Sequence, residues 1–264
     1  MIVTLLTDFG DSDAFVAAMK GVILRINPAA RLIDIAHNLR PHRLKDAAWL
    51  LNCSWRFYPA GTVHLVVVDP GVGGERRPII ITRGEQMFVG PDNGVFTYLY
   101  DADFCAYEIT NSRYMREEVS KTFHGRDIFA PVAAHLSAGV EVGRIGTRMK
   151  DPVMFEVPRP MVTANGVEGS IMHVDHFGNL ITNINRELFE RAFVSNSYEV
   201  VIGEERIPKI SASYDQVPEG SLLAIWGSEN TLEISANLSS AARRLNIDER
   251  SIDGVRVLIR KEGK

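Results

Sequence analysis

Short apolar runs and longer segments of helical spacing alternate along the first half of the chain. Apolar residues recur at helical spacing up to about residue 26, and a stretch rich in Ala, Leu and Trp covers about 43–57, which predicts two amphipathic helices. Side chains at 11–13 offer an N-cap for the first helix, and Asp127 offers one for a helix at 128–138. The β-branched runs between helices predict buried strands, and the β-α-β-α-β order predicts a parallel sheet with right-handed crossovers. We expect these strands at 2–6, 31–36, 66–68, 79–81, 87–89 and 106–110, with a further helix at about 94–100.

The pattern changes near residue 160. Residues 150–165 contain three prolines and an Asn-Gly pair, which is typical of a linker. Short strands separated by turn residues follow, with one short helix at 186–192, and they predict a small barrel or sandwich. We therefore divide the chain into an α/β domain at 1–158 and a β-rich domain at 159–264. The strands of the second domain are expected at 167–174, 180–184, 198–202, 206–210, 221–226, 231–235 and 255–260.

Composition narrows the class of protein. A net charge of −4 over 264 residues gives no support to nucleic-acid binding, and the apolar runs are too short to span a membrane. The start of the chain lacks the basic residues of a signal peptide. Cys53 and Cys105 lie far apart, without metal-ligand spacing, so we expect neither a disulfide framework nor a zinc site. Together these features favour a cytoplasmic protein.

The stretch from Val66 to Ile81 carries the first candidate chemistry. Two apolar runs flank a segment rich in Gly and Pro, so Asp69 follows the end of a strand and Arg76 lies about one loop away. Open α/β sheets bind ligands at the carboxyl ends of their strands. By itself, however, the stretch is equally consistent with an aspartate that caps a turn and arginines that face solvent.

Other polar residues are expected at the same edge of the sheet. Asp8 also ends a predicted strand, and Asn93 and His124 lie in loops that can reach this edge. The glycine-rich motifs that bind dinucleotides or triphosphates are absent from the sequence. Carboxylates at such a position can accept hydrogen bonds from both hydroxyls of a ribose.

In the second domain, a turn between strands carries Asp175 and Asn179. The pair can bind an ammonium group and an adenine edge, but it can equally form an Asx turn, and spacing favours the turn. His173 and His176 flank Asp175, but on a strand 173 and 175 share a face while 176 points away, and no second acidic cluster follows, so we expect no metal site there. The polar turn at 226–230 is of a kind that is more often structural than functional.

These pieces resemble, in order along almost the whole chain, the S-adenosyl-L-methionine hydroxide adenosyltransferases, relatives of fluorinase and chlorinase. Each piece alone is weak, whereas the ordered set is specific. The matching stretches are Thr7-Asp8-Phe9-Gly10, Val68 to Gly73 with Arg76, Gly90 to Gly94, Thr122 to Asp127, Asp175 to Asn183, and Gly227-Ser228.

The resemblance implies a Rossmann-like α/β amino-terminal domain, a β-barrel carboxy-terminal domain, and a homotrimer with sites at subunit interfaces. It implies hydrolysis of S-adenosyl-L-methionine to adenosine and L-methionine by attack of water at the ribose 5′-carbon, without a metal or cofactor. The residue roles that it implies are Asp8 for the ribose hydroxyls, Asp175 for the ammonium, Asn179 for adenine, Ser228 for the carboxylate, Tyr214 for the wall of the adenine pocket, and Asp69, Arg76 and His124 for the water.

Departures from the fluorinase type concern the nucleophile. Those enzymes have a Tyr-Ser pair where this chain has His124-Gly125, and that serine helps to bind halide; they also lack the aspartate found here as Asp69. Both differences argue for water rather than halide. Glu229 replaces a basic residue of some relatives, next to the position expected to hold the substrate carboxylate.

The implied chemistry is reasonable. A sulfonium is already a good leaving group, so the reaction needs an in-line nucleophile freed of bulk water rather than an acid or a metal. A carboxylate held by an arginine is a poor base, so we expect positioning to matter more than proton abstraction.

Two other functions remain as hypotheses. The stretch Thr7 to Ala14 has some likeness to the aspartate-rich start of calcium-dependent nucleoside hydrolases, although Thr and Ser stand where that family has acids. A non-catalytic protein that senses an adenosyl compound would need the same pocket without turnover.

Overall fold

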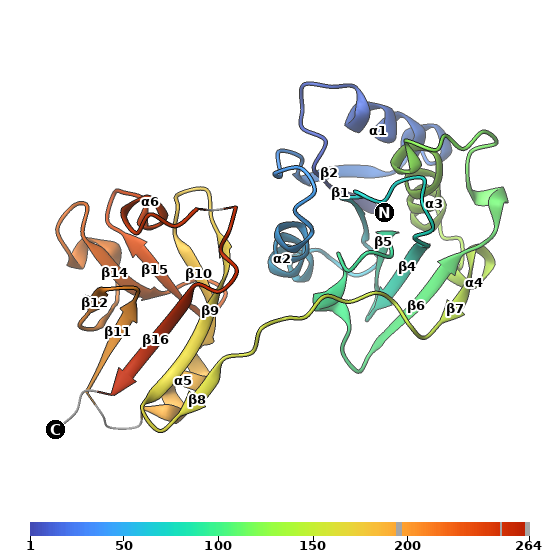
Figure 1. The fold of residues 1–264 in the computed structure, drawn as a ribbon. Coiled ribbons are helices and arrows are strands. Elements are labelled where there is room, and N and C mark those ends of the chain that lie inside the picture. Colours follow the sequence, from blue (N-terminus) through green and yellow to red (C-terminus); the bar gives the residue numbers. More distant parts are fainter. Residues whose placement is uncertain (194–196, 249, 262–264) are drawn as a thin grey trace. The chain divides into compact units, whose positions relative to one another are not determined.

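The computed structural model describes residues 1–193, 197–248 and 250–261, and the chain forms two compact units, Met1–Phe155 and Glu156–Lys264. The first unit is built on a seven-stranded sheet in the order β2-β1-β3-β5-β4-β6-β7 (Figure 1). Strands β2, β1, β3 and β5 run parallel, as the sequence predicts, and β4, β6 and β7 continue the sheet in antiparallel fashion. The strands are β1 (Ile2–Thr7), β2 (Arg31–Ala36), β3 (Val63–Val67), β4 (Pro78–Arg83), β5 (Gln86–Pro91), β6 (Phe104–Ile109) and β7 (Gly146–Met149).

Helices cover both faces of this sheet. Helix α1 (Phe15–Ile26) lies beside α3 (Ala130–Ser137) on one face, and α2 (Leu44–Ser54) packs on the other (Figure 1). A short helix, α4 (Val142–Ile145), precedes β7. Because both faces are covered, the central strands β1 and β3 are buried almost along their whole length and are mostly apolar.

The strand order reverses direction at β1. The connection through α1 leads outward to β2, and the connection through α2 returns across β1 to β3. Thr7 and Val67, the last residues of these two strands, are register partners. Such a switch point is where open α/β sheets leave a crevice for ligands. Asp8 follows β1 directly, and Asp69 is the second residue after β3.

The second unit is a mixed, mainly antiparallel sheet with its own core. Its strands run in the order β12-β11-β16-β9-β10-β15-β14-β13, with β8 paired to β9. Strand β12 also approaches β14 near the other end of this path, so the sheet curls nearly into a barrel. The elements are β8 (Met161–Thr163), β9 (Gly166–Val174), β10 (Leu180–Asn185), α5 (Arg186–Ala192), β11 (Tyr198–Ile202), β12 (Glu205–Ile207), β13 (Ile210–Ser211), β14 (Leu222–Trp226), β15 (Thr231–Ala236), α6 (Ala241–Arg244) and β16 (Arg256–Lys261).

Some local predictions are wrong in whole or in part. Helix α1 starts after Ala14, without a side-chain cap, rather than after the acids at 11–13. Asp127 does not cap a helix, because a π-helical turn at Gly125–Phe129 already includes it. The helix expected at 94–100 is only a 3₁₀ turn, Thr97–Leu99. Residues 151–160 of the expected linker form no helix or strand, and only its end, Met161–Thr163, is the strand β8.

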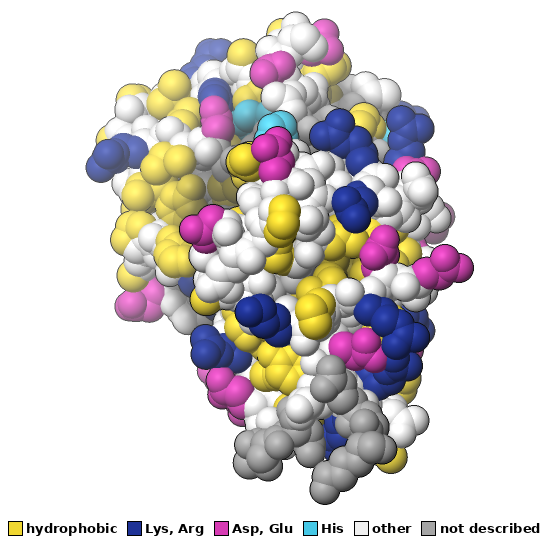
Figure 2. Space-filling model, turned by 90° about the vertical axis from the view of Figure 1, so that its left-hand side faces the viewer, with side chains coloured by type: hydrophobic (Ala, Val, Ile, Leu, Met, Phe, Trp, Pro, Cys, Tyr) yellow, Lys and Arg dark blue, Asp and Glu magenta, His cyan; other side chains and the backbone are white. Residues whose placement is uncertain are grey.

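Surface charge is mixed where it can be seen. On the face drawn in Figure 2, Lys and Arg side chains alternate with Asp and Glu, and hydrophobic side chains form small groups between them. In the described part of the chain, no helix is long and apolar enough to cross a membrane.

Candidate active site

The loop after β3 brings Asp69 and Arg76 together. Arg76 Nε lies 3.0 Å from each carboxylate oxygen of Asp69, and Arg76 Nη2 also donates to Asp69 Oδ2. Both side chains are almost buried, with 9% of Arg76 and 4% of Asp69 exposed. The solvated-arginine alternative is therefore wrong for Arg76. Gly73 enables this path: it has φ +76°, and a Cβ there would lie 2.2 Å from the Lys121 carbonyl oxygen.

His124 is the third member of this group. Arg76 Nη2 lies 2.7 Å from His124 Nδ1, and a guanidinium can only donate, so Nδ1 accepts and the ring proton is on Nε2. Burial lowers the pKa of His124, and the charge of Arg76 lowers it further, against the effect of Asp69. His124 is therefore a neutral imidazole whose Nε2–H can donate a hydrogen bond.

Two contacts hold the π-helical turn Gly125–Phe129, which directly follows His124. The ring of Phe129 lies 5.2 Å under the Arg76 guanidinium. Asp127, fully buried, accepts from the Ser120 amide at 2.9 Å and from the side chains of Arg126 and Arg116. Burial opposes ionisation of Asp127, but these hydrogen bonds lower its pKa overall. The π-helical turn, a form that is frequent at functional sites, is thus fixed at both ends.

Asp8 and Asn93 lie at the neighbouring strand ends. Asp8 is half-buried and its Oδ2 accepts from the His42 amide at 2.8 Å. Asn93 donates to the carbonyl oxygen of Val68 at 2.9 Å, so it braces the backbone directly before Asp69. Asn93 therefore supports the backbone next to Asp69. Asp8 and Asp69 come after the ends of the neighbouring strands β1 and β3.

In the second unit, Asp175 and Asn179 form the Asx turn that spacing favours. Asp175 Oδ1 accepts from the amides of Phe177 and Asn179 at 2.9 and 2.8 Å, and Oδ2 accepts from the Asn179 side chain at 2.9 Å. Gly178 has φ +84°, and a Cβ there would lie 2.0 Å from Ser240 Oγ. The turn is therefore tightly packed, and Asn179 is 7% exposed.

Glu233 on β15 joins this turn and was missed from the sequence. Burial raises the pKa of its carboxyl, and the charge of Asp175 raises it further, against a hydrogen bond from Tyr214 that lowers it. A Cβ on Gly227 would lie 1.7 Å from Glu233 Oε1, so Glu233 packs under the turn that exposes Ser228. A glutamate between the apolar Leu232 and Ile234 was the available signal.

A cavity of about 550 Å³ opens beside Asn179 and Tyr214. Phe177, Leu238 and Arg243 also line it, and Phe177 and Leu238 are 72% and 84% exposed. Apolar walls with an amide at one side suit a flat heteroaromatic ring. None of these three residues is among the predicted site residues, although Phe177 belongs to the 175–179 turn and its aromatic ring was the available signal.

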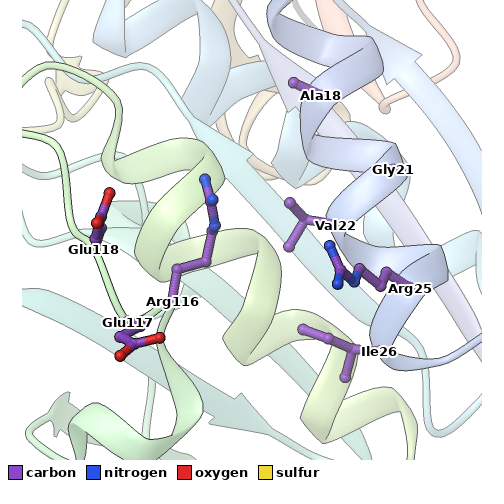
Figure 3. A pocket seen from close by; sticks show the side chains of 8 residues that line it. All are labelled: Ala18, Gly21, Val22, Arg25, Ile26, Arg116, Glu117 and Glu118. Carbon is purple, nitrogen blue, oxygen red and sulfur yellow. The ribbon is translucent and has the colours of Figure 1, made fainter.

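A second cavity lies elsewhere on the first unit. Figure 3 shows this groove of about 640 Å³, where Ala18, Val22 and Ile26 of α1 face the segment 116–118. It includes none of Asp8, Asp69, Arg76, Asn93 and His124. Within the described ranges, no three His, Cys, Asp or Glu side chains are grouped so that they could hold a metal ion, and this includes the acids at 8–13.

Comparisons with known proteins agree with this arrangement. The models of the SAM hydroxide adenosyltransferase N-terminal and C-terminal domains match residues 3–146 and 169–252. The (R)-S-adenosyl-L-methionine hydrolase of Salinispora tropica is 37% identical over 254 residues, covering 93% of this chain and 94% of that protein. The enzyme of the same name from Thermus thermophilus is 37% identical over 256 residues, covering 94% and 96%.

A solved structure of an uncharacterized conserved protein from Thermotoga maritima is 37% identical and superposes with a TM-score of 0.89, covering 99% of this chain and 100% of that chain. Both halves of the chain are therefore matched, in sequence and in fold. The chain belongs to the SAM hydroxide adenosyltransferase family.

Proposed function

We propose that this protein hydrolyses (R)-S-adenosyl-L-methionine to adenosine and L-methionine, without a metal or cofactor. The observation that carries the proposal is the nearly buried chain Asp69–Arg76–His124 at the switch point of the first sheet. The names of the relatives from Salinispora tropica and Thermus thermophilus support the same substrate and stereoisomer.

The proposed reaction is a direct displacement. The oxygen of water attacks the ribose 5′-carbon, the carbon–sulfur bond breaks, and its electron pair stays on sulfur as the thioether of methionine. The proton of the attacking water passes to Asp69, whose oxygens keep lone pairs beyond those used by Arg76, and then to solvent. His124 donates from Nε2 to the same water and thereby orients its remaining lone pair. Holding the water in line supplies more of the rate than the weak base does.

Substrate binding divides between the two units. In the first, Asp8 accepts from the ribose hydroxyls and Asn93 supports the wall that holds Asp69. In the second, Asn179 binds the adenine edge between Phe177 and Tyr214. Asp175 and Glu233 attract the methionine ammonium, and the exposed Ser228 binds the carboxylate.

Because these groups lie on separate units, we propose a homotrimer in which the first unit of one chain and the second unit of its neighbour form each site. We also propose that the first unit is a Rossmann-like domain, on the basis of its switch point and two helical layers, and that the second is a β-barrel. The small-molecule substrate makes a nucleic-acid or membrane partner unnecessary. Both cysteines are thiols, which suits the cytoplasm.

The test uses the separated stereoisomers of S-adenosyl-L-methionine, with and without EDTA, and chromatography for adenosine and methionine. Stoichiometric release of both from the (R) form, unchanged by EDTA, is the expected result. The Asp69→Asn variant loses most of this activity, whereas Glu75→Gln, an exposed acid of the same loop, keeps it. Tight binding without products would show a sensor instead, and EDTA-sensitive release of adenine from nucleosides would show a nucleoside hydrolase.

A further inference from the structure

A chain of polar side chains runs from the protein surface to the residue before Asp8. Thr7, fully buried at the end of β1, has its hydroxyl oxygen 2.8 Å from His37 Nδ1. His37 Nε2 lies 3.0 Å from Asp34 Oδ1, at ion-pair distance, and Lys20 Nζ lies 2.6 Å from Asp34 Oδ2. The proposed catalytic group Asp69–Arg76–His124 does not include any of these residues.

The donors and acceptors of this chain are mutually consistent. The Phe9 amide donates to Thr7 Oγ1 at 3.3 Å, which leaves the hydroxyl proton of Thr7 available to His37 Nδ1. The other ring nitrogen of His37 then carries its proton toward the Asp34 carboxylate. His37 Nε2 lies at ion-pair distance from Asp34 but makes no well-aligned hydrogen bond, so the carboxylate holds the ring by charge.

A β-bulge brings His37 to this position. Leu5 pairs with Asp34, but Leu6 pairs with Ala36, so Ile35 is an extra residue in β2. In an unbroken register Ala36 would lie beside Thr7, and the extra residue places His37 there instead. Bulges that redirect a side chain are frequent next to active sites.

The same segment of chain holds the Asp8 loop at two further points. The Gly10 amide donates to the His37 carbonyl at 2.9 Å, and the His42 amide donates to Asp8 Oδ2 at 2.8 Å. His42 has φ +66°, a left-handed conformation that is costly for a residue with a side chain. The segment 37–42 thus accepts strain where it aims an amide at the Asp8 carboxylate.

The residue types Thr, His and Asp also occur in nucleophilic triads, but this arrangement does not fit that role. The Thr7 side chain has no exposed surface, and its oxygen is engaged by a backbone amide. No substrate can reach it without unfolding the end of β1.

We propose that His37 is a positioning residue that, through Thr7 and Asp34, fixes the Asp8 carboxylate for the ribose hydroxyls. This inference rests on the proposed function, because Asp8 is assigned there as the ribose ligand. The bulge of β2 thereby contributes to substrate binding, separately from the group Asp69–Arg76–His124 that holds the water.

The chain offers a matched control. Thr4 lies on the same strand, is equally buried, and has its hydroxyl 2.8 Å from Nδ1 of another histidine, His64. Thr7→Val and Thr4→Val each remove one buried hydroxyl beside a histidine, but only the first adjoins Asp8. Thr7→Ser restores the hydroxyl, and Asp34→Asn changes the half-exposed end of the chain with little risk to folding.

Thr7→Val is expected to raise KM for the substrate and Kd for adenosine by about 10- to 100-fold with kcat changed far less. His37→Leu is expected to raise KM and Kd to the same extent, and Asp34→Asn to raise them less. Thr7→Ser is expected to leave both at wild-type values. Thr4→Val lowers the melting temperature without changing KM. Equal KM effects of Thr7→Val and Thr4→Val, or His37 variants that change only the melting temperature, would overturn the proposal.

Hydrogen exchange separates this inference from the proposed function. The amides of residues 8–10 exchange faster in Thr7→Val and His37→Leu than in Thr4→Val, whether or not the wild-type protein turns over the substrate. Unchanged exchange at 8–10 contradicts the positioning role itself. Absence of turnover and of adenosine binding by the wild-type protein contradicts the proposed function instead.

Discussion

Arg76 lies between Asp69 and His124 and donates to both, with Nη2 2.7 Å from His124 Nδ1. Because the guanidinium has no acceptor, this contact removes Nδ1 as a place for a proton and leaves Nε2–H as the donor of His124. In the proposed reaction the proton of water therefore passes to Asp69, and His124 only orients the water. The position of Asp69, which takes the proton, and of His124, which orients the water, therefore both depend on Arg76.

Replacing Arg76 by Lys keeps the charge but loses the planar fork that reaches both partners. We expect kcat to fall by about 10²-fold with a smaller change in KM, because positioning of the water is lost. Arg77→Lys is the control: Arg77 is the next residue but binds Asp92 and Asp151, and its rate stays within about twofold of wild type. Initial rates of adenosine formation measure the effect. Equal losses of kcat in the two variants would show that Arg76 has no special role in the site.

The proposed homotrimer, with each site shared between two subunits, predicts complementation. Asp69→Asn damages the first unit and Asn179→Ala the second, so each homotrimer is nearly inactive. In a mixed ring one site of the three is intact, and doubly tagged mixed trimers are expected to recover about one third of wild-type activity. Mixed trimers that stay as inactive as their parents would show that each site forms within one chain.

Gly178 tests the turn that holds Asn179. Gly178→Ala adds a Cβ 2.0 Å from Ser240 Oγ at φ +84°, so the turn must distort. Gly203→Ala is matched for backbone strain, with φ +57° and open space around it, and costs about 1 kcal/mol. We expect Gly178→Ala to cost about 1–3 kcal/mol more in urea unfolding and to weaken adenosine binding at least tenfold. Adenosine affinity that is equal in the two variants contradicts a role for the turn.

Glu233 predicts proton release on substrate binding. Burial and the charge of Asp175 raise the pKa of Glu233, so in mildly acidic buffer more of this carboxyl is protonated than of an ordinary glutamate. An ammonium group favours the ionised carboxylate, and binding then expels that proton. Calorimetry with adenosine and with methionine, in buffers of different ionisation enthalpy, measures it. The wild-type protein is expected to release a proton when it binds methionine but not when it binds adenosine, and Glu233→Gln is expected to release none. Proton release with adenosine alone would place Glu233 away from the methionine ammonium.

His64 predicts loss of stability in acid. Burial lowers its pKa to about 4, against a hydrogen bond to Gln86 that raises it. Between pH 6.5 and 4 the unfolded chain binds a proton that the folded chain does not, so the unfolding free energy falls as the pH falls through this window. From pH 7 to 5 the loss due to His64 is about 2 kcal/mol. Urea unfolding of wild type and His64→Gln at both pH values measures it, and identical pH dependences would contradict this assignment.

Much of the fold is readable from local patterns. The β-branched run before Asp69 and the helical spacing up to residue 26 specify a strand and a helix because apolar periodicity decides which face is buried. Helix ends were less readable. Burial of Ile128 and Phe129 draws Asp127 into a π-helical turn, where its carboxylate binds the Ser120 amide rather than capping a helix. Tertiary packing there overrides capping preference.

The sequence by itself determined the β-α-β-α-β order at the start of the chain and the placement of Asp8 and Asp69 after strand ends, because each follows from residues close together in the chain. Only the tertiary structure decided that Arg76 reaches His124, 48 residues away, that a bulge sets His37 beside Thr7, and that Glu233 packs against Gly227. These pairings depend on sheet register and on how separate loops pack, which local periodicity does not encode.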